Sequence, residues 1–136
     1  MLRFLYLPGA GKFLLLCISL LAALVASGYA DLSVEEIIDL KNHGVTGEMI
    51  IGLKKSEWSH LAAREIIKLR DHGVGPSYLA RLRRAGNSTL SVDDVVTLKN
   101  NNVSPEEVGV INALGFGPFN VRQIVDLHNH GGTDSD

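Results

Sequence analysis

The stretch DLKNHGV, residues 39–45, decides the fold because the chain contains four versions of it. KLRDHGV begins at Lys68, TLKNNNV at Thr97 and DLHNHGG at Asp126, so the same 29-residue step separates each version from the next. Around them, fourteen aligned positions stay in register, and the apolar positions never hold a charge. A constant period of this length is typical of stacked structural repeats.

Each aligned segment has the spacing of an amphipathic helix, and helical periodicity fits all four better than strand alternation. In the first segment the apolar stripe consists of Val34, Ile37, Ile38 and Leu40. The segments begin with an N-cap residue followed three places later by a capping-box partner. These pairs are Ser33 with Glu36, Ser91 with Asp94 and Asn120 with Gln123. The second segment has Ala62 at the cap position, which predicts a weaker helix start.

The helix ends follow a common pattern too. Gly or Asn stands where a helix closes with a left-handed residue, at Gly44, Gly73, Asn102 and Gly131. A second helix start follows at Thr46, Gly75 and Ser104, with Pro76 and Pro105 at the first helical position. Gly86 and Gly115 end two of these second helices.

The predicted fold class is therefore all-α, built from tandem 29-residue helix–turn–helix hairpin repeats. Three and a half copies occupy residues 31–131, as repeats 32–60, 61–89, 90–118 and 119–131. A disordered tail is expected at 132–136.

Residues 1–30 have the order of a secretory signal peptide. Arg3 and Lys12 flank a mildly apolar start, an apolar run without charges follows at residues 13–26, and the small residues Gly28 and Ala30 stand at a cleavage site. The run is shorter than the roughly twenty residues that cross a bilayer. We expect an exported chain, periplasmic or secreted, with an uncleaved membrane anchor through residues 13–30 as the alternative.

Composition argues against several classes of protein. The only cysteine, Cys17, lies in the predicted signal, so residues 31–136 offer neither a disulfide nor a thiolate site. Those residues have 11 basic and 15 acidic side chains, and a net charge of −4 argues against a general nucleic-acid binder. The sequence contains no nucleophile motif or phosphate-binding loop. We expect no enzyme activity, no cofactor and no small-molecule substrate.

The segment LSVDDVVTLKNNNVSPEEVGVINALG, residues 90–115, resembles short tandem helical-hairpin repeats of bacterial envelope-associated proteins. The shared features are an acid-capped VxxL helix, a GV turn and an S-P-E helix start. The resemblance covers essentially all of residues 31–136, although the second copy departs from it at Ala62 and Gly75. It implies the architecture and a role in association, with no established shared activity.

Three histidines occupy one aligned column and are weak candidates for metal ligands: His43, His72 and His130, with Asn101 in the third copy. The structural alternative is that a side chain at a helix C-terminus donates to free carbonyls and suits the negative end of the dipole. Asn101 can donate but is a poor metal ligand, which favours capping.

The second copy is the main functional candidate, because it has six basic and two acidic side chains, while the first copy, the third copy and the last copy with its tail are net negative. These basic groups either complement neighbouring copies or bind an acidic protein or an anionic membrane surface. The candidate partner-binding residues are Arg64, Lys68, Arg81, Arg83 and Arg84, with Trp58 and Tyr78 as aromatic anchors if they are exposed.

Together these patterns favour an exported, non-enzymatic helical-repeat protein that serves as a protein–protein interaction module in the cell envelope. Two alternatives stay open. One is a membrane-anchored regulatory or scaffold protein of an envelope complex, and the other is a metal- or pH-responsive module that uses the histidine column.

Overall fold

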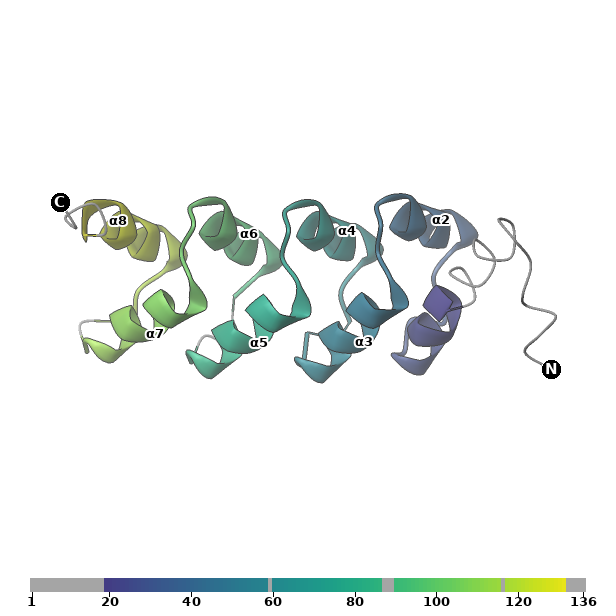
Figure 1. Cartoon of the computed structure of the whole chain (residues 1–136), viewed down its shortest axis with the longest axis horizontal. Helices are drawn as coiled ribbons and strands as arrows, with labels where there is room; N and C mark the ends of the chain where they lie inside the picture. The colour runs from purple at the N-terminus through teal and green to yellow at the C-terminus, as the bar shows by residue number, and fades with distance from the viewer. Residues whose placement is uncertain (1–18, 59, 87–89, 116, 132–136) are drawn as a thin grey trace. The chain divides into compact units, whose positions relative to one another are not determined.

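The computed structural model of the chain describes residues 19–58, 60–86, 90–115 and 117–131, and within these ranges all regular structure is helical. The all-α prediction is confirmed. The helices, after a helical segment at residues 19–26, are α2 (Val34–Asn42), α3 (Gly47–Lys55), α4 (Ala63–Asp71), α5 (Pro76–Arg84), α6 (Val92–Asn100), α7 (Pro105–Ala113) and α8 (Val121–Gly131) (Figure 1). None of the helices in these ranges is both long enough and apolar enough to cross a membrane.

Helix starts lie where the predicted caps put them. α2, α4, α6 and α8 begin at a constant 29-residue interval, and so do α3, α5 and α7. At α2 the Ser33 hydroxyl accepts from the Glu36 amide at 3.1 Å, and the Glu36 carboxylate accepts from the Ser33 amide at 2.9 Å. Two further reciprocal pairs cap α6 and α8, namely Ser91 with Asp94 and Asn120 with Gln123.

The second copy has fewer caps than the others, as its sequence predicts. Ala62 has no side-chain acceptor, and only its amide donates to the Glu65 carboxylate, at 2.8 Å. Gly75 likewise makes no side-chain bond at the start of α5, whereas Thr46 and Ser104 cap α3 and α7. Both helices of this copy therefore begin with fewer hydrogen bonds than their counterparts.

The left-handed helix ends are present at all predicted positions but one. Gly44, Gly73 and Asn102 have φ angles of +80°, +74° and +61°, a conformation that glycine adopts freely and asparagine tolerates. The prediction is wrong at Gly131, because α8 runs for 11 residues and Gly131 is its last helical residue.

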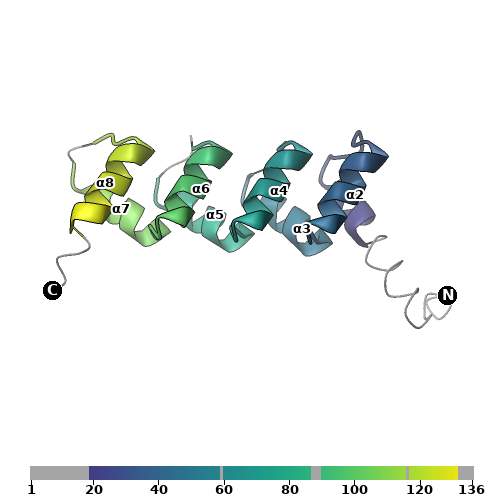
Figure 2. The same cartoon turned by 90° about the horizontal axis from the view of Figure 1, so that it is seen from above.

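The chain divides into two compact units, residues 1–70 and 71–136. In the first unit, residues 19–26, α2, α3 and most of α4 surround an apolar core, and α2 and α4 lie side by side in both views (Figures 1 and 2). The core side chains that are at most 1% exposed are Leu24, Leu40, Ile50, Leu53, Ile66 and Leu69.

In the second unit, α5 packs on α7 and α6 packs on α8. This core is as tightly enclosed as the first, with Leu79, Leu82, Val95, Leu98, Val108 and Ile124 at most 1% exposed.

Residues 19–29, which the sequence assigns to a signal peptide, are packed into the first unit. Leu20 and Leu24 are at most 2% exposed, and Tyr29 is 7% exposed. The Lys54 ammonium donates to the Ala26 carbonyl at 3.1 Å, and the Leu61 amide donates to the Tyr29 hydroxyl at 3.2 Å. The rest of the predicted signal, residues 1–18, and the predicted tail at 132–136 lie outside the described residues.

The 29-residue period extends backwards into this segment, which the sequence patterns had not indicated. Gly28 closes the helix at residues 19–26 with a φ of +90°, as Gly86 and Gly115 close α5 and α7 at +93° and +81°. The Tyr29 amide then donates to the Leu24 carbonyl at 2.8 Å, as Trp58 does to Leu53 at 2.9 Å. Residues 19–26 are thus the counterpart of α3, α5 and α7.

Candidate functional site

Several basic side chains of the second copy have partners within their own unit. The Arg81 guanidinium, on α5, makes a bidentate pair with the Glu106 carboxylate on α7, including a 2.8 Å bond from Nε. This hydrogen bonding holds the pKa of Glu106 below its usual value and raises that of Arg81. In the first unit, Arg70 Nε donates to the Gly44 carbonyl at 3.1 Å. For these two arginines the structure supports the interpretation that they complement neighbouring copies.

Arg83 and Arg84 stand in the last turn of α5, where a cation stabilises the negative end of the helix dipole. Their position has a structural explanation, although the Arg84 side chain is exposed.

Arg64 and Lys68 differ from the other candidates in position. Both are exposed on α4 and lie four residues apart, so they share one helix face. We call this pair the α4 basic face. Arg64 is in the first turn of α4, where the helix dipole disfavours a cation. At the equivalent position α2 and α6 have the acids Glu35 and Asp93, and α8 has Arg122.

The two aromatic candidates are buried, so neither ring is presented as an exposed anchor. Trp58 and Tyr78 are each 8% exposed. The Tyr78 hydroxyl donates to the Val103 carbonyl at 2.7 Å, and burial raises the pKa of Tyr78 to about 12. The indole Nε1 of Trp58 has no hydrogen-bond partner among the described residues. Both side chains serve the interior of their units.

The histidine column is not uniform. Asn101 Nδ2 donates to the Thr97 carbonyl at 2.8 Å, which is the predicted capping bond. His72 Nδ1 instead lies 3.2 Å from the Asn100 side-chain oxygen, and His43 is the C-cap residue of α2. His130 is exposed on α8. In the parts of the chain that the structure describes, no three His, Cys, Asp or Glu side chains come close enough to hold one metal ion.

A pair that the sequence patterns did not predict joins α8 to α7. His128 Nδ1 lies 2.7 Å from Glu107 Oε2, and both side chains are partly buried. One feature of the sequence could have pointed to it. Glu107 is the only charged residue in a column otherwise occupied by Leu20, Met49 and Tyr78, and a carboxylate in such a buried position needs a partner.

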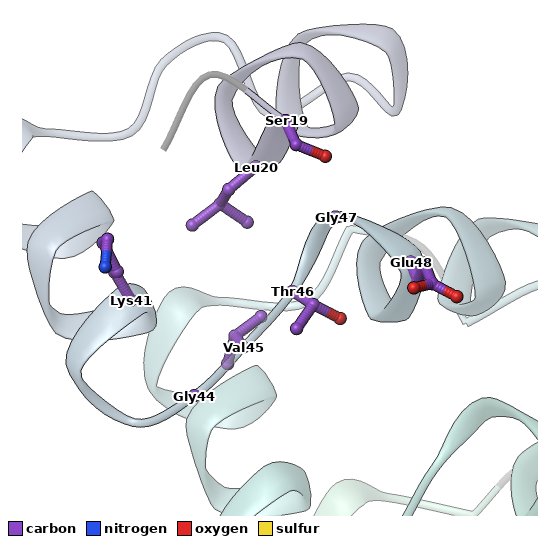
Figure 3. Close-up of a pocket in the computed structure, with 8 residues that line it drawn as sticks. All are labelled: Ser19, Leu20, Lys41, Gly44, Val45, Thr46, Gly47 and Glu48. Atoms are coloured by element: carbon purple, nitrogen blue, oxygen red, sulfur yellow. The ribbon is translucent and has the colours of Figure 1, made fainter. Parts of the chain in front are cut away.

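A hollow of about 210 Å³ lies in the first unit beside the start of α3 (Figure 3). Leu20 stands over the turn from Gly44 to Gly47, with Lys41 on one side and Glu48 on the other. The first turn of α3 is already capped by Thr46. The residues that line this hollow are Ser19, Leu20, Lys41, Gly44, Val45, Thr46, Gly47 and Glu48.

The second unit has an equivalent hollow of about 230 Å³ beside the start of α7, lined by Tyr78, Arg81, Lys99, Asn102, Val103, Ser104 and Pro105. Six of these positions lie two repeats further along the chain than lining positions of the first hollow. A hollow that recurs at the same aligned positions is a seam between consecutive hairpins, and Thr46 and Ser104, which line the two hollows, serve as the N-caps of α3 and α7. We therefore assign no catalytic chemistry to it.

No protein-family model matches this chain, and neither a curated protein nor a solved structure shows a significant match to it.

Proposed function

We propose that the chain is a non-enzymatic array of tandem helical hairpins, similar to those of bacterial envelope-associated proteins, and that it acts by binding another protein. The contact surface is the α4 basic face, and the partner presents acidic side chains to it. Residues 1–30 have the order of an export signal, whereas residues 19–29 pack into the first unit, so the fate of this segment is tested separately below.

One observation is the main support for this surface. Arg64 occupies a helix start that the dipole makes unfavourable for a cation, so helix stability does not explain it. Lys68 follows on the same exposed face. Two adjacent cations attract an acidic surface and accelerate its encounter.

The other basic residues are less suitable as contacts. Arg81 is neutralised by Glu106, and Arg83 and Arg84 stabilise the end of α5. Trp58 and Tyr78 are buried and are left out of the proposed surface.

The test is affinity capture from native envelope extract with the full chain as bait, compared with Arg64→Glu/Lys68→Glu. Arg83→Glu/Arg84→Glu changes the net charge by the same amount and is the matched control. Circular dichroism first establishes that each bait is folded. We expect one protein to be lost with the α4 variant and retained with the control, and its binding to weaken as salt is raised.

Retention of the same proteins by all three folded baits would refute the α4 basic face. Loss of the captured protein with the control variant alone would place the contact surface at the end of α5.

The fate of residues 19–30 has a separate test. Cleavage after Ala30 would remove a helix that the first unit packs against α3, and insertion of residues 13–30 in a bilayer would withdraw the same helix. Because Leu20, Leu24 and Tyr29 are buried, we propose that these residues stay on the folded chain. The intact mass of the protein purified from its native host decides between retention and removal.

A further inference from the structure

Large apolar side chains are exposed near the start of the described chain at positions that later copies bury. Val34 is 67% exposed, whereas its counterparts are at most 9% exposed. Leu21 is 41% exposed, whereas all of its counterparts are fully buried. The counterparts, one repeat apart, are Ala63, Val92 and Val121 for Val34, and Ile50, Leu79 and Val108 for Leu21. With Ile38, which is 51% exposed, Val34 and Leu21 form what we call the leading surface.

The last described helices also expose large apolar side chains, here at positions that earlier copies bury. Leu127 of α8 is 42% exposed, whereas Leu40, Leu69 and Leu98 at the equivalent positions are fully buried. Leu114, which follows α7, is 57% exposed, whereas at its position Ser27 and Ser56 are 6% and 7% exposed and Ala85 is partly buried. We call Leu114, Leu127 and the neighbouring Phe119 the trailing surface.

Packing inside the second unit shows what these two surfaces fit. A seam between α6 and α8 is lined by Asp94 and Thr97 on one side and by Val121 and Val125 on the other. The α2 counterparts of Val121 and Val125 are Val34 and Ile38. The leading surface therefore consists of the positions with which α8 packs on α6.

The other side of this seam recurs on the trailing surface. The α8 counterparts of Asp94 and Thr97 are Gln123 and Asp126. These two residues line a shallow hollow of about 280 Å³ on α8, together with Phe119, Leu127 and His130. α8 thus presents outwards the positions that α6 presents to α8.

We propose that a second copy of this chain covers both surfaces, so that α8 of one copy packs on α2 of the next. α7 of one copy then packs on residues 19–26 of the next copy, as α5 packs on α7 within the second unit. Each contact repeats an interface that already exists within the second unit, which is why we choose a second copy as the occupant.

The contact is heterologous, because each copy contributes a different surface. Such association continues head to tail into longer assemblies or closes into a ring. It uses neither Arg64 nor Lys68, so the proposed function and this inference fail or succeed separately.

The test is sedimentation velocity of the full chain over a wide dilution series. We expect species above the monomer mass that dissociate on dilution. Val34→Glu and Leu127→Glu each place a charge in one apolar surface, and each should weaken association by more than about tenfold. Both positions are exposed, so the folds should be retained, which circular dichroism checks. Ile51→Glu, at a position in α3 that is 42% exposed and belongs to neither surface, should associate like the wild type.

Mixing the two variants gives the deciding result. Val34→Glu retains its trailing surface and Leu127→Glu retains its leading surface, so the mixture should recover a species of two chains and nothing larger. A wild-type chain that stays monomeric at all concentrations overturns the proposal. So does a mixture of folded variants that shows no recovery, because the leading and trailing surfaces then do not bind each other.

Discussion

The hydroxyl of Tyr78, in α5, donates a 2.7 Å hydrogen bond to the backbone carbonyl of Val103, in the turn before α7. Both residues are buried, so removal of the hydroxyl leaves a buried acceptor unsatisfied. We expect Tyr78→Phe to lower the free energy of unfolding by about 1 kcal/mol, as measured by urea denaturation. Ser77→Ala changes a less buried residue of the same helix and should have no such effect. Equal losses in the two variants would contradict this assignment.

The raised pKa of the Tyr78 hydroxyl predicts a loss of stability at alkaline pH. Burial is the main cause that raises the pKa of Tyr78 from 10.0 to about 12, while Arg81 lowers it and Glu106 raises it by smaller amounts. Between these two values the unfolded chain has released the proton and the folded chain has kept it. A rising pH therefore favours the unfolded state, by about 1.4 kcal/mol per unit across this window.

Comparison with Tyr78→Phe isolates this contribution, since all other titrating groups are common to both proteins. The free energy of unfolding, measured from about pH 9 to about pH 12, should fall less steeply with pH for the variant than for the wild type. Identical pH profiles would show that Tyr78 ionises equally in the folded and unfolded chains.

Ala62→Ser should stabilise the chain. The Ala62 amide already donates to the Glu65 carboxylate, so a serine hydroxyl would complete the reciprocal pair seen at Ser33 and Glu36. An N-cap of this kind contributes about 1 kcal/mol, and a higher midpoint in thermal unfolding would show it. Ser91→Ala removes an existing cap and should lower the free energy of unfolding by a similar amount. A midpoint that does not rise, despite a loss in Ser91→Ala, would mean that α4 gains nothing from the cap.

Gly47→Ala should separate residues 19–26 from α3. A Cβ at Gly47 would lie 2.9 Å from the Ser19 backbone carbonyl oxygen and 3.3 Å from the Ala23 Cβ, and backbone cannot move aside as a flexible side chain can. The expected loss of about 1 to 2 kcal/mol is the overpacking cost reduced by the helix propensity gained from alanine. The control is Gly75→Ala, where a Cβ meets nothing within 4 Å. Unchanged stability in Gly47→Ala would argue that residues 19–26 do not pack there.

Local chemistry made most of the fold predictable from sequence. The caps at Ser33, Ser91 and Asn120 and the closures at Gly44 and Gly73 each depend on a few neighbouring residues, so a pattern is sufficient to locate them. Residues 19–26 are harder to interpret, because an apolar run has the same composition in a signal peptide and in a packed helix. Only the alignment of Leu24 with Leu53, and of Gly28 with Gly86, distinguishes the two.

The candidate site was less predictable, because side-chain roles depend on which helix lies opposite. Arg81 and Arg64 belong to the same basic copy, yet Arg81 meets Glu106 while Arg64 is exposed at a helix start. The sequence makes Tyr78 a candidate contact residue, but its hydroxyl donates to the Val103 carbonyl in a turn 25 residues away. No periodic pattern specifies these partners.

Trp58 is the only tryptophan of the chain, it is buried, and it belongs to the first unit. Its fluorescence is therefore an intrinsic reporter of one half of the protein, whereas circular dichroism follows helices in both halves. If the two signals change at the same denaturant concentration, the halves unfold as one cooperative body; if they change apart, each half has a stability of its own.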